Sequence, residues 1–196
     1  TRSALMTGRH PMKNGVTHTI LERERMTLKA TILPQVLKQA GYTSGIFGKW
    51  HLGDNYPYRP QDRGFEETLW FPSSHIGSVP DNWGNNYFDD TYRWNGKHKK
   101  FTGYCTDIFF DHAIDWIKRS AAAGEPFFAY LPTNTPHGPF LAPDEDIEVM
   151  EEVVTNTKLP RMTPRTKSNL VRYLAMIRNV DTNMGRLMAF LDESGL

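Results

Sequence analysis

Three short segments of the chain carry side chains that suit the binding of a tetrahedral oxyanion. The first is GKWHLG at 48–53, where a predicted strand gives way to a loop. Ligands bind at such strand ends in α/β folds. If the chain stays extended here, Lys49 and His51 point to the same face, and they offer a fixed positive charge beside a group that titrates near neutral pH. The same residues also fit an exposed lysine and an incidental imidazole beside a packed Trp50.

The second segment is PHGPF at 136–140, which also follows a predicted strand. Pro136 and Pro139 restrict φ on either side of His137, so the loop is expected to present one imidazole rigidly. The alternative is a histidine that only bonds a carbonyl and shapes a turn. Because both histidine loops follow predicted parallel strands, we expect His51 and His137 at one edge of the sheet.

The third segment is TRSALMTGR at 1–9, which reads as a helix that Gly8 ends. Arg2 stands at the head of this helix, where free N–H groups and the helix dipole favour anions. A guanidinium there adds bidentate contacts to an oxyanion. Because Thr1 enters directly into this pattern, we expect residues 1–196 to be an internal part of a longer chain.

Other catalytic patterns are absent from the sequence. It contains no G-x-S-x-G, P-loop, H-E-x-x-H or G-x-G-x-x-G motif. The single Cys105 has no partner for an internal disulfide, and we interpret it as a packing residue. His75, His98 and His112 receive no role.

The composition fits one globular domain and excludes several classes of partner. Of the 196 residues, 39% are hydrophobic and 12% aromatic, which is enough for a core. Since 23 basic residues nearly balance 22 acidic ones, nucleic acid and anionic membranes are not expected as partners. The one basic cluster, KHKK at 97–100, is interpreted as a solvated loop tip. No apolar run reaches the roughly 20 residues that span a bilayer.

The periodicity of apolar residues predicts an α/β fold with a parallel sheet. Only two strands are evident, too few for such a sheet, so the domain is expected to be truncated at both ends. Residues 54–104 read as a long irregular excursion with a hairpin near 87–101. A kink or late start is expected in the second helix because of Pro34. The predicted helices lie at 3–8, 28–40, 106–119 and 166–193, and the predicted strands at 42–50 and 126–132.

Two further expectations concern burial. The strand at 126–132 is a continuous apolar run, which is typical of a strand covered on both faces. The last helix is expected to bury one apolar stripe made of Leu170, Tyr173, Leu174, Ile177, Val180, Met184, Leu187 and Leu191. The helix at 106–119 is expected to be capped by Thr106 or Asp107.

Together these segments resemble the sulfatases, and most closely the arylsulfatase A-like enzymes of the alkaline-phosphatase superfamily. TRSALMTGR (1–9) is similar to the first sulfatase signature without its first three residues, and GYTSGIFGKWHLG (41–53) is similar to the second. PFFAYLPTNTPHGPF (126–140) and YLAMIRNVDTNMGRLMAFLDESGL (173–196) resemble the histidine loop and the long helix of the family. The resemblance implies that 1–196 is part of a single catalytic domain with an alkaline-phosphatase-like three-layer α/β/α sandwich.

The resemblance also implies a reaction and a role for each site residue. Sulfatases hydrolyse sulfate monoesters through a formylglycine nucleophile, which is expected here upstream of residue 1. Arg2 would hold the formylglycine hydrate, and His51 would hydrogen-bond it. Lys49 would bind sulfate oxygens, and His137 would contact the sulfate and the ester oxygen as a proton donor.

The family binds Ca²⁺ through ligands that are expected outside this sequence, because six or more oxygens cannot be assembled from the matched residues. The chain by itself is therefore expected to bind no catalytic calcium and to release no 4-nitrophenol from its sulfate ester. The implied substrate is a sulfated small molecule or a sulfated glycan, and the implied location is periplasmic or secreted. Self-association is expected because an incomplete sheet exposes apolar edges.

Two alternatives stay open at this point. One is a phosphonate or phosphate monoester hydrolase of the same superfamily, which shares the nucleophile motif. The other is a non-catalytic binding module that keeps the fold without the chemistry.

Overall fold

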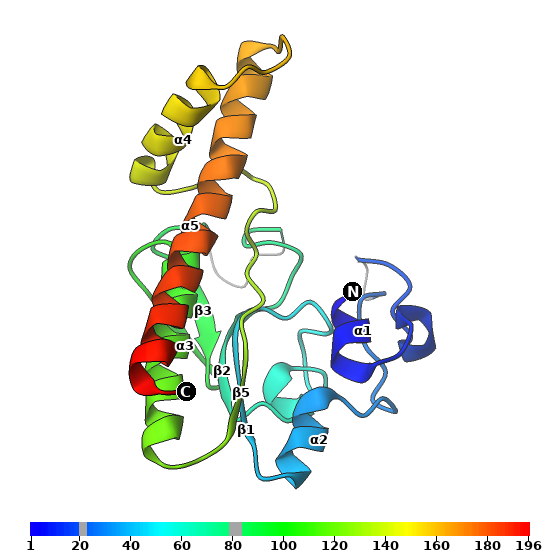
Figure 1. Ribbon diagram of the computed structural model, residues 1–196. Helices are drawn as coiled ribbons and strands as arrows, with labels where there is room; N and C mark the ends of the chain where they lie inside the picture. The colour runs from blue at the N-terminus through cyan, green and yellow to red at the C-terminus, as the bar shows by residue number, and fades with distance from the viewer. Residues whose placement is uncertain (20–22, 79–83) are drawn as a thin grey trace.

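The computed structural model describes residues 1–19, 23–78 and 84–196 (Figure 1). Helices and strands are mixed along the chain. In chain order the elements are α1 (Arg2–Thr7), the 3-10 turn η1 (Pro11–Asn14), α2 (Leu33–Gln39), β1 (Thr43–Lys49), the 3-10 turn η2 (Pro60–Arg63), β2 (Glu67–Phe71), β3 (Thr91–Trp94), β4 (Lys97–Lys100), α3 (Cys105–Ala122), β5 (Phe127–Tyr130), α4 (Asp144–Asn156) and α5 (Pro164–Ser194).

One mixed sheet forms the centre of the fold, with the strand order β4-β3-β2-β1-β5. β1 pairs in parallel with β2 on one side and with β5 on the other, and β3 and β4 extend the sheet as an antiparallel hairpin. Because β1, β2 and β5 run in the same direction, their C-terminal ends share one edge of the sheet. The loops that follow them therefore lie close together.

The sheet separates two hydrophobic clusters, which makes the fold a three-layer α/β/α sandwich. In β1, Phe47 belongs to the cluster beneath α3 and α5, and Ile46 belongs to the cluster that contains Met6 of α1 and Ile32 at the start of α2. Figure 1 shows these helix pairs on opposite sides of the sheet. The predicted fold class is thereby confirmed.

The segment 54–104, expected to be irregular, contains three of the five strands. β2 lies inside the sheet and buries Leu69 on one face and Trp70 on the other. The predicted hairpin is present as β3 and β4. Its turn residues Asn95 and Gly96 both have positive φ, 45° and 81°, as a two-residue type I′ connection requires. KHKK is consequently an exposed strand, not a loop tip.

The late start predicted for the second helix is confirmed, whereas the predicted cap of the third helix is wrong. The second helix begins at Leu33, not at residue 28, because Pro34 belongs in a first turn where its missing N–H costs nothing. α3 begins at Cys105, with Tyr104 as its N-cap and no side-chain capping bond. Thr106 does not cap the helix; its hydroxyl lies 3.3 Å from that of Thr135 in the loop after β5.

The last part of the chain corrects two burial predictions. All four residues of β5 are half-buried, because β1 is its one partner strand among the described residues. In α5, Tyr173, Ile177 and Met184 of the predicted stripe are exposed. The buried face of α5 instead contains Val171, Ala175, Met176, Asn179, Asn183 and Leu187.

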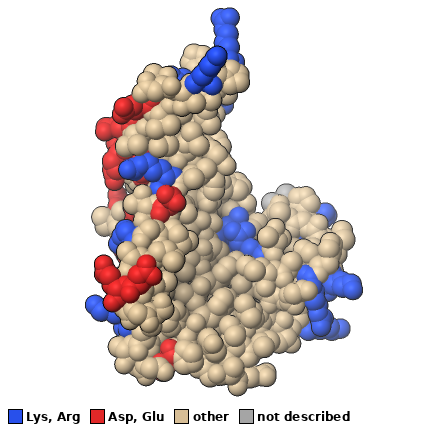
Figure 2. Space-filling view, viewed as in Figure 1, with Lys and Arg blue, Asp and Glu red and all other residues tan. Residues whose placement is uncertain are grey.

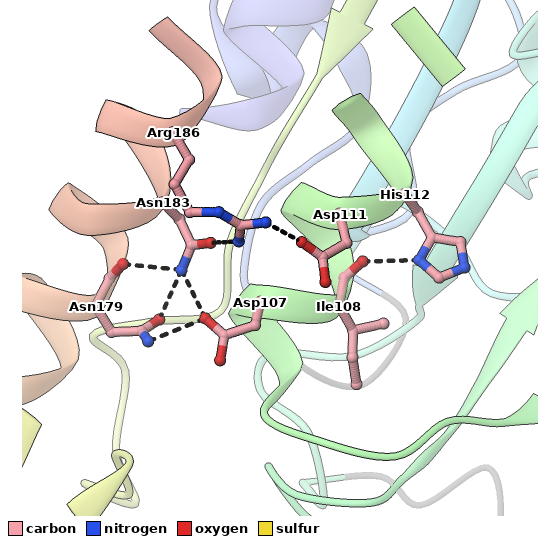
Figure 3. A network of polar contacts seen from close by, with 7 residues as sticks. All are labelled: Asp107, Ile108, Asp111, His112, Asn179, Asn183 and Arg186. Atoms are coloured by element: carbon pink, nitrogen blue, oxygen red, sulfur yellow. Dashed lines mark hydrogen bonds and ion pairs between the residues drawn. The ribbon is translucent and has the colours of Figure 1, made fainter. Parts of the chain in front are cut away.

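Polar side chains explain why α5 buries a different face. The amides of Asn179 and Asn183 donate to one carboxylate oxygen of Asp107 on α3, at 3.0 and 2.6 Å. Arg186 bridges Asn183 and Asp111 of α3 (Figure 3). A hydrophobic pattern alone does not identify the contact between α3 and α5, since hydrogen bonds as well as apolar residues form it.

The helix α4 was not predicted, and its surface is acidic. Figure 2 shows acidic side chains gathered over α4, and the exposed ones are Asp144, Glu145, Glu148, Glu151 and Glu152. The acidic residues of its first turn interact favourably with the positive end of the helix dipole. Within the described part of the chain, no helix combines the length and the hydropathy needed to traverse a bilayer.

Candidate active site

The ends of the parallel strands bring the predicted site residues to one edge of the sheet. The N–H of Lys49, the last residue of β1, donates to the carbonyl of Pro132 after β5 at 2.7 Å. Two residues on, the N–H of His51 donates to the carbonyl of Pro72 after β2 at 3.0 Å. These backbone bonds tie the loop that contains Lys49 and His51 to both neighbouring loops.

Gly48 permits this close approach of β1 and the segment after β5. Its φ is 131°, and a Cβ built at this position would lie 2.5 Å from the carbonyl oxygen of Pro132. No L side chain fits that space without moving backbone. Gly48 is therefore the residue that lets Lys49 lie beside the His137 loop.

His51 leaves the extended path expected for residues 49–51. Its φ is 56°, so the chain turns sharply directly after β1. The ring is oriented by the carbonyl of Thr19, which lies 2.7 Å from Nε2. Because a carbonyl only accepts, Nε2 carries the proton and Nδ1 is left as the acceptor of the neutral ring.

Arg2 lies on α1, in the helical layer on the face of the sheet opposite to α3 and α5. It is the first residue of α1, and this short helix is held by the buried side chain of Asn14, which donates to Ser3 Oγ at 2.9 Å and Thr7 Oγ1 at 2.8 Å. Burial lowers the pKa of Arg2, while the neighbouring Tyr130 of β5 acts in the opposite direction. The predicted position of Arg2 at the head of the helix is confirmed.

The electrostatics of the site are those of crowded positive groups. Lys49 is only 6% exposed, and its pKa falls from 10.5 to about 8, first through burial and then through the charge of Arg2. The pKa of His51 falls to about 4; burial is the largest cause, and the charges of Lys49, Arg2 and His137 add to it. The residues whose charges lower the pKa of His51 are those that the sequence predicts for the same site.

His137 is held by its own loop. Its N–H donates to the carbonyl of Asn134 at 2.9 Å, and its carbonyl accepts from the hydroxyl of Tyr87 at 3.0 Å. In the ring, Nδ1 lies 2.7 Å from the carbonyl of Gly138, so Nδ1 carries a proton and Nε2 faces away from that carbonyl.

Two adjoining cavities meet at this edge of the sheet. One has a volume of about 270 Å³ and contains His51 and His137 in its wall. The other, of about 100 Å³, is lined by Arg2 and also by His51. Thr19 and Glu24 line both cavities. The remaining wall of the larger cavity consists of Gly53, Asp54, Pro72, Ser73, Ser74, His75 and Ser78.

Several of these wall residues were not identified from the sequence. Ser74 and His75 lie in the loop after β2, and because β2 was not recognised, its C-terminal loop was not examined as a ligand site. The ring of His75 stacks on that of His137 with centroids 4.8 Å apart. The signal that identifies this loop is the short apolar run LWF at 69–71 followed directly by Pro72 and two serines.

The groups near Lys49 do not fit a calcium ion. Ca²⁺ takes six to eight oxygen ligands, largely from carboxylates. Among residues 1–19, 23–78 and 84–196, no three His, Cys, Asp or Glu side chains are grouped so that they could hold a metal. The charged neighbour that lowers the pKa of Lys49 is the cation Arg2.

A three-layer sandwich with Lys49, His51 and His137 just after the C-terminal ends of its parallel strands agrees with an alkaline-phosphatase-like hydrolase fold. Comparison with known families identifies the particular branch. The model of the family described as Sulfatase matches residues 1–196, and the chain belongs to this family.

The relatives are consistent in sequence and in structure. N-acetylgalactosamine-6-sulfatase of Canis lupus familiaris is 29% identical over 211 residues, covering 98% of this chain and 37% of the relative. Arylsulfatase G of the same species is 32% identical over 158 residues, covering 66% of this chain and 30% of the relative. The crystal structure of Ps i-CgsB in complex with k-i-k-neocarrahexaose aligns with a TM-score of 0.78 at 26% identity, covering 99% of this chain and 44% of that one. The chain thus spans less than half the length of these relatives.

Proposed function

We propose that this chain supplies the sulfate-binding and leaving-group residues of an enzyme that hydrolyses sulfate monoesters. Lys49 binds the sulfate oxygens, Arg2 holds the nucleophile, His51 accepts a hydrogen bond from it, and His137 donates a proton to the ester oxygen. The proposal assigns no nucleophile within residues 1–196.

The observation that carries this proposal is the unfavourable position of Lys49. A buried ammonium near a guanidinium is costly, and burial together with the charge of Arg2 lowers the pKa of Lys49 accordingly. A dianion or a sulfate ester bound between the two cations would offset it. Strongly perturbed pKa values that arise from burial and a specific charged neighbour are typical of functional sites.

The protonation states give each residue a consistent task. Lys49 is cationic below a pKa of about 8, so near neutral pH it stabilises charge on the sulfate oxygens. His51, with a pKa of about 4, is neutral there, and its Nδ1 lone pair accepts the hydrogen of the attacking group. When the ester S–O bond breaks, its electron pair stays on the leaving oxygen. That oxygen takes the proton from Nε2 of protonated His137, which retains Nδ1–H on the carbonyl of Gly138.

A sugar is the leaving group that we propose. Beyond His51 and His137, the larger cavity is lined by Thr19, Ser73, Ser74, Ser78, Glu24 and Asp54, together with Gly53, Pro72 and His75. The polar residues among these can hydrogen-bond sugar hydroxyls. The relatives support this choice, since one is named for N-acetylgalactosamine 6-sulfate hydrolysis and the solved neighbour contains neocarrahexaose. A periplasmic or secreted location stays a prediction from the family resemblance.

Sulfate binding by the chain tests the proposal without requiring turnover. We expect isothermal titration calorimetry with sodium sulfate at pH 7 to detect binding, and Lys49→Ala to weaken it at least about tenfold, since loss of one partner of a buried charge pair costs over 1.4 kcal/mol. Lys49→Arg, which keeps the charge, and His98→Ala, on the exposed strand β4, serve as controls. Equal affinity in the wild type and Lys49→Ala would contradict the proposal.

A further inference from the structure

We propose that His75 is a positioning residue for His137: the stacked imidazole fixes the ring plane of His137 so that Nε2 is the atom presented to the ester oxygen. The role of His137 as proton donor rests on the function proposed above. The placement of its ring by His75 is a separate claim about the chain itself.

The geometry of the two rings is that of a face-to-face contact. Their centroids lie 4.8 Å apart and their planes differ by 19°. Both rings line the larger cavity together with His51. The two histidines come from loops after different strands, β2 and β5, so the contact is not imposed by their position in the sequence.

The ring of His137 has few other restraints among the described residues. One edge is held by the Nδ1 bond to Gly138 at 2.7 Å. On the other edge, Nε2 lies 3.5 Å from Ser74 Oγ, at the limit of a hydrogen bond. The ring turns about its Cβ–Cγ bond, and a contact on the ring face opposes that turn in addition to the Nδ1 bond. The stack with His75 is such a contact.

The backbone of His75 is anchored within its turn. The carbonyl of His75 accepts from Ser73 Oγ at 3.1 Å and from the backbone N–H of Ser78 at 3.1 Å. The N–H of His75 donates to Ser78 Oγ at 3.3 Å. The next residue, Ile76, is buried in the core on the α3 side of the sheet. The turn 73–78 therefore holds the backbone of His75 at both of its polar groups.

The charges near His75 favour the neutral form of its ring. Burial lowers the pKa of His75, and the charges of His137 and Lys49 lower it further. The neutral form of the His75 ring is therefore favoured. A neutral ring beneath an imidazolium offers its π face to the cation, whereas two imidazolium rings at this separation would repel each other.

The test is nitrogen NMR of the histidine rings in the intact chain, without sulfate. In the wild type and in His75→Phe, which keeps an aromatic face, we expect the Nδ1–H form of neutral His137 to dominate. In His75→Ala the ratio of the Nδ1–H to the Nε2–H form should fall about fivefold, the weight of one ordinary hydrogen bond. His98→Ala is the matched control and should leave His137 unchanged.

Two outcomes would overturn the inference. One is an unchanged tautomer ratio of His137 in His75→Ala; the other is a His75→Phe variant as altered as the alanine variant, which would mean that the ring face does no positioning. If His75→Ala loses the wild-type fold, His75→Leu, of similar volume but without a planar face, replaces it. Sulfate affinity is measured separately, so the failure of this inference and the failure of the proposed function give different results.

Discussion

At the scale of single residues, Lys49 shows how a site can be recognised by its energetic cost. A lysine at the surface would keep its ordinary pKa and would need no explanation. Here the ammonium is almost fully buried at the end of β1 and close to Arg2. The fold tolerates this arrangement because Gly48 and the backbone bond to Pro132 fix the segment in place. The cost is a property of the fold that a bound anion would relieve.

The pKa of Lys49 predicts how sulfate affinity depends on pH. Because Lys49 is cationic below its pKa of about 8 and neutral above it, the affinity should fall as the pH rises through 8. Above the pKa the decline should approach tenfold per pH unit, since one proton is then taken up on binding. His51 does not contribute in this range because its pKa is about 4.

Calorimetry with sulfate at a series of pH values measures this profile. Lys49→Arg is the matched variant, since a guanidinium does not titrate below pH 10. It should give a flat profile over the same range. An identical fall in the wild type and in Lys49→Arg would assign the dependence to another group.

The sequence predicts the cationic site residues better than it predicts the walls of the cavity. Arg2, Lys49, His51 and His137 stand out because their types suit an oxyanion and because each lies at the end of a predicted element. His75 carries the same imidazole group as His137, but it follows strand β2. That strand is not evident from the sequence, because segments rich in Gly, Pro and Asp surround it.

At the scale of secondary structure, the strands that failed to appear in the sequence have a physical reason. β2 is five residues long and lies between segments rich in Gly, Pro and Asp, so its apolar run is too short to show a period. Its burial comes from β1 on one side and the hairpin on the other, and these contacts are distant in sequence. The hairpin was predictable because Asn95 and Gly96 specify its turn locally.

The misassigned face of α5 has a different cause. The prediction placed Met184 in the core because apolar residues usually form the buried stripe of a helix. In the structure Asn183 takes that position, since the amide pairs with Asp107 of α3 (Figure 3). Periodicity cannot show that a buried polar residue has a partner on another helix.

This pairing predicts the effect of a substitution on stability. Asn183→Ala removes the 2.6 Å bond to the carboxylate of Asp107 and also the acceptor for Arg186. We expect the free energy of unfolding to fall by about 2 kcal/mol, because a partly buried charged group loses a hydrogen-bond donor. Urea denaturation followed by circular dichroism measures the change.

Thr182→Ala is the control for this substitution, because Thr182 is the preceding, exposed residue of the same helix. It should change stability by less than about 0.5 kcal/mol. If Asn183→Ala is equally mild, the contact between α3 and α5 depends on its apolar residues alone.

At the scale of the whole molecule, two surfaces are less covered than a self-contained domain requires. α4 and the first half of α5 project beyond the sheet, and β5 is half-buried along its full length (Figure 1). On α5 the exposed apolar residues form one stripe, at spacings of four, seven and four residues. They are Tyr173, Ile177, Met184 and Met188, with exposed fractions of 38%, 39%, 44% and 50%.

Such a stripe predicts that the chain associates with a second copy of itself. Residues at these spacings lie on one face of a helix, and a contiguous exposed apolar face on a soluble chain favours burial against another surface. We expect the apparent mass in sedimentation equilibrium to rise with protein concentration. The double substitution Ile177→Glu and Met184→Glu places two like charges in the contact and should raise the dissociation constant at least about tenfold, or 1.4 kcal/mol.

Thr182→Glu adds a charge to the same helix outside the stripe and should leave the association unchanged. A concentration-independent monomer in the wild type, or equal weakening by Thr182→Glu, would exclude the stripe as the contact. In the latter case the edge strand β5 becomes the surface to test, because an unpaired strand edge also offers hydrogen bonds to a second chain.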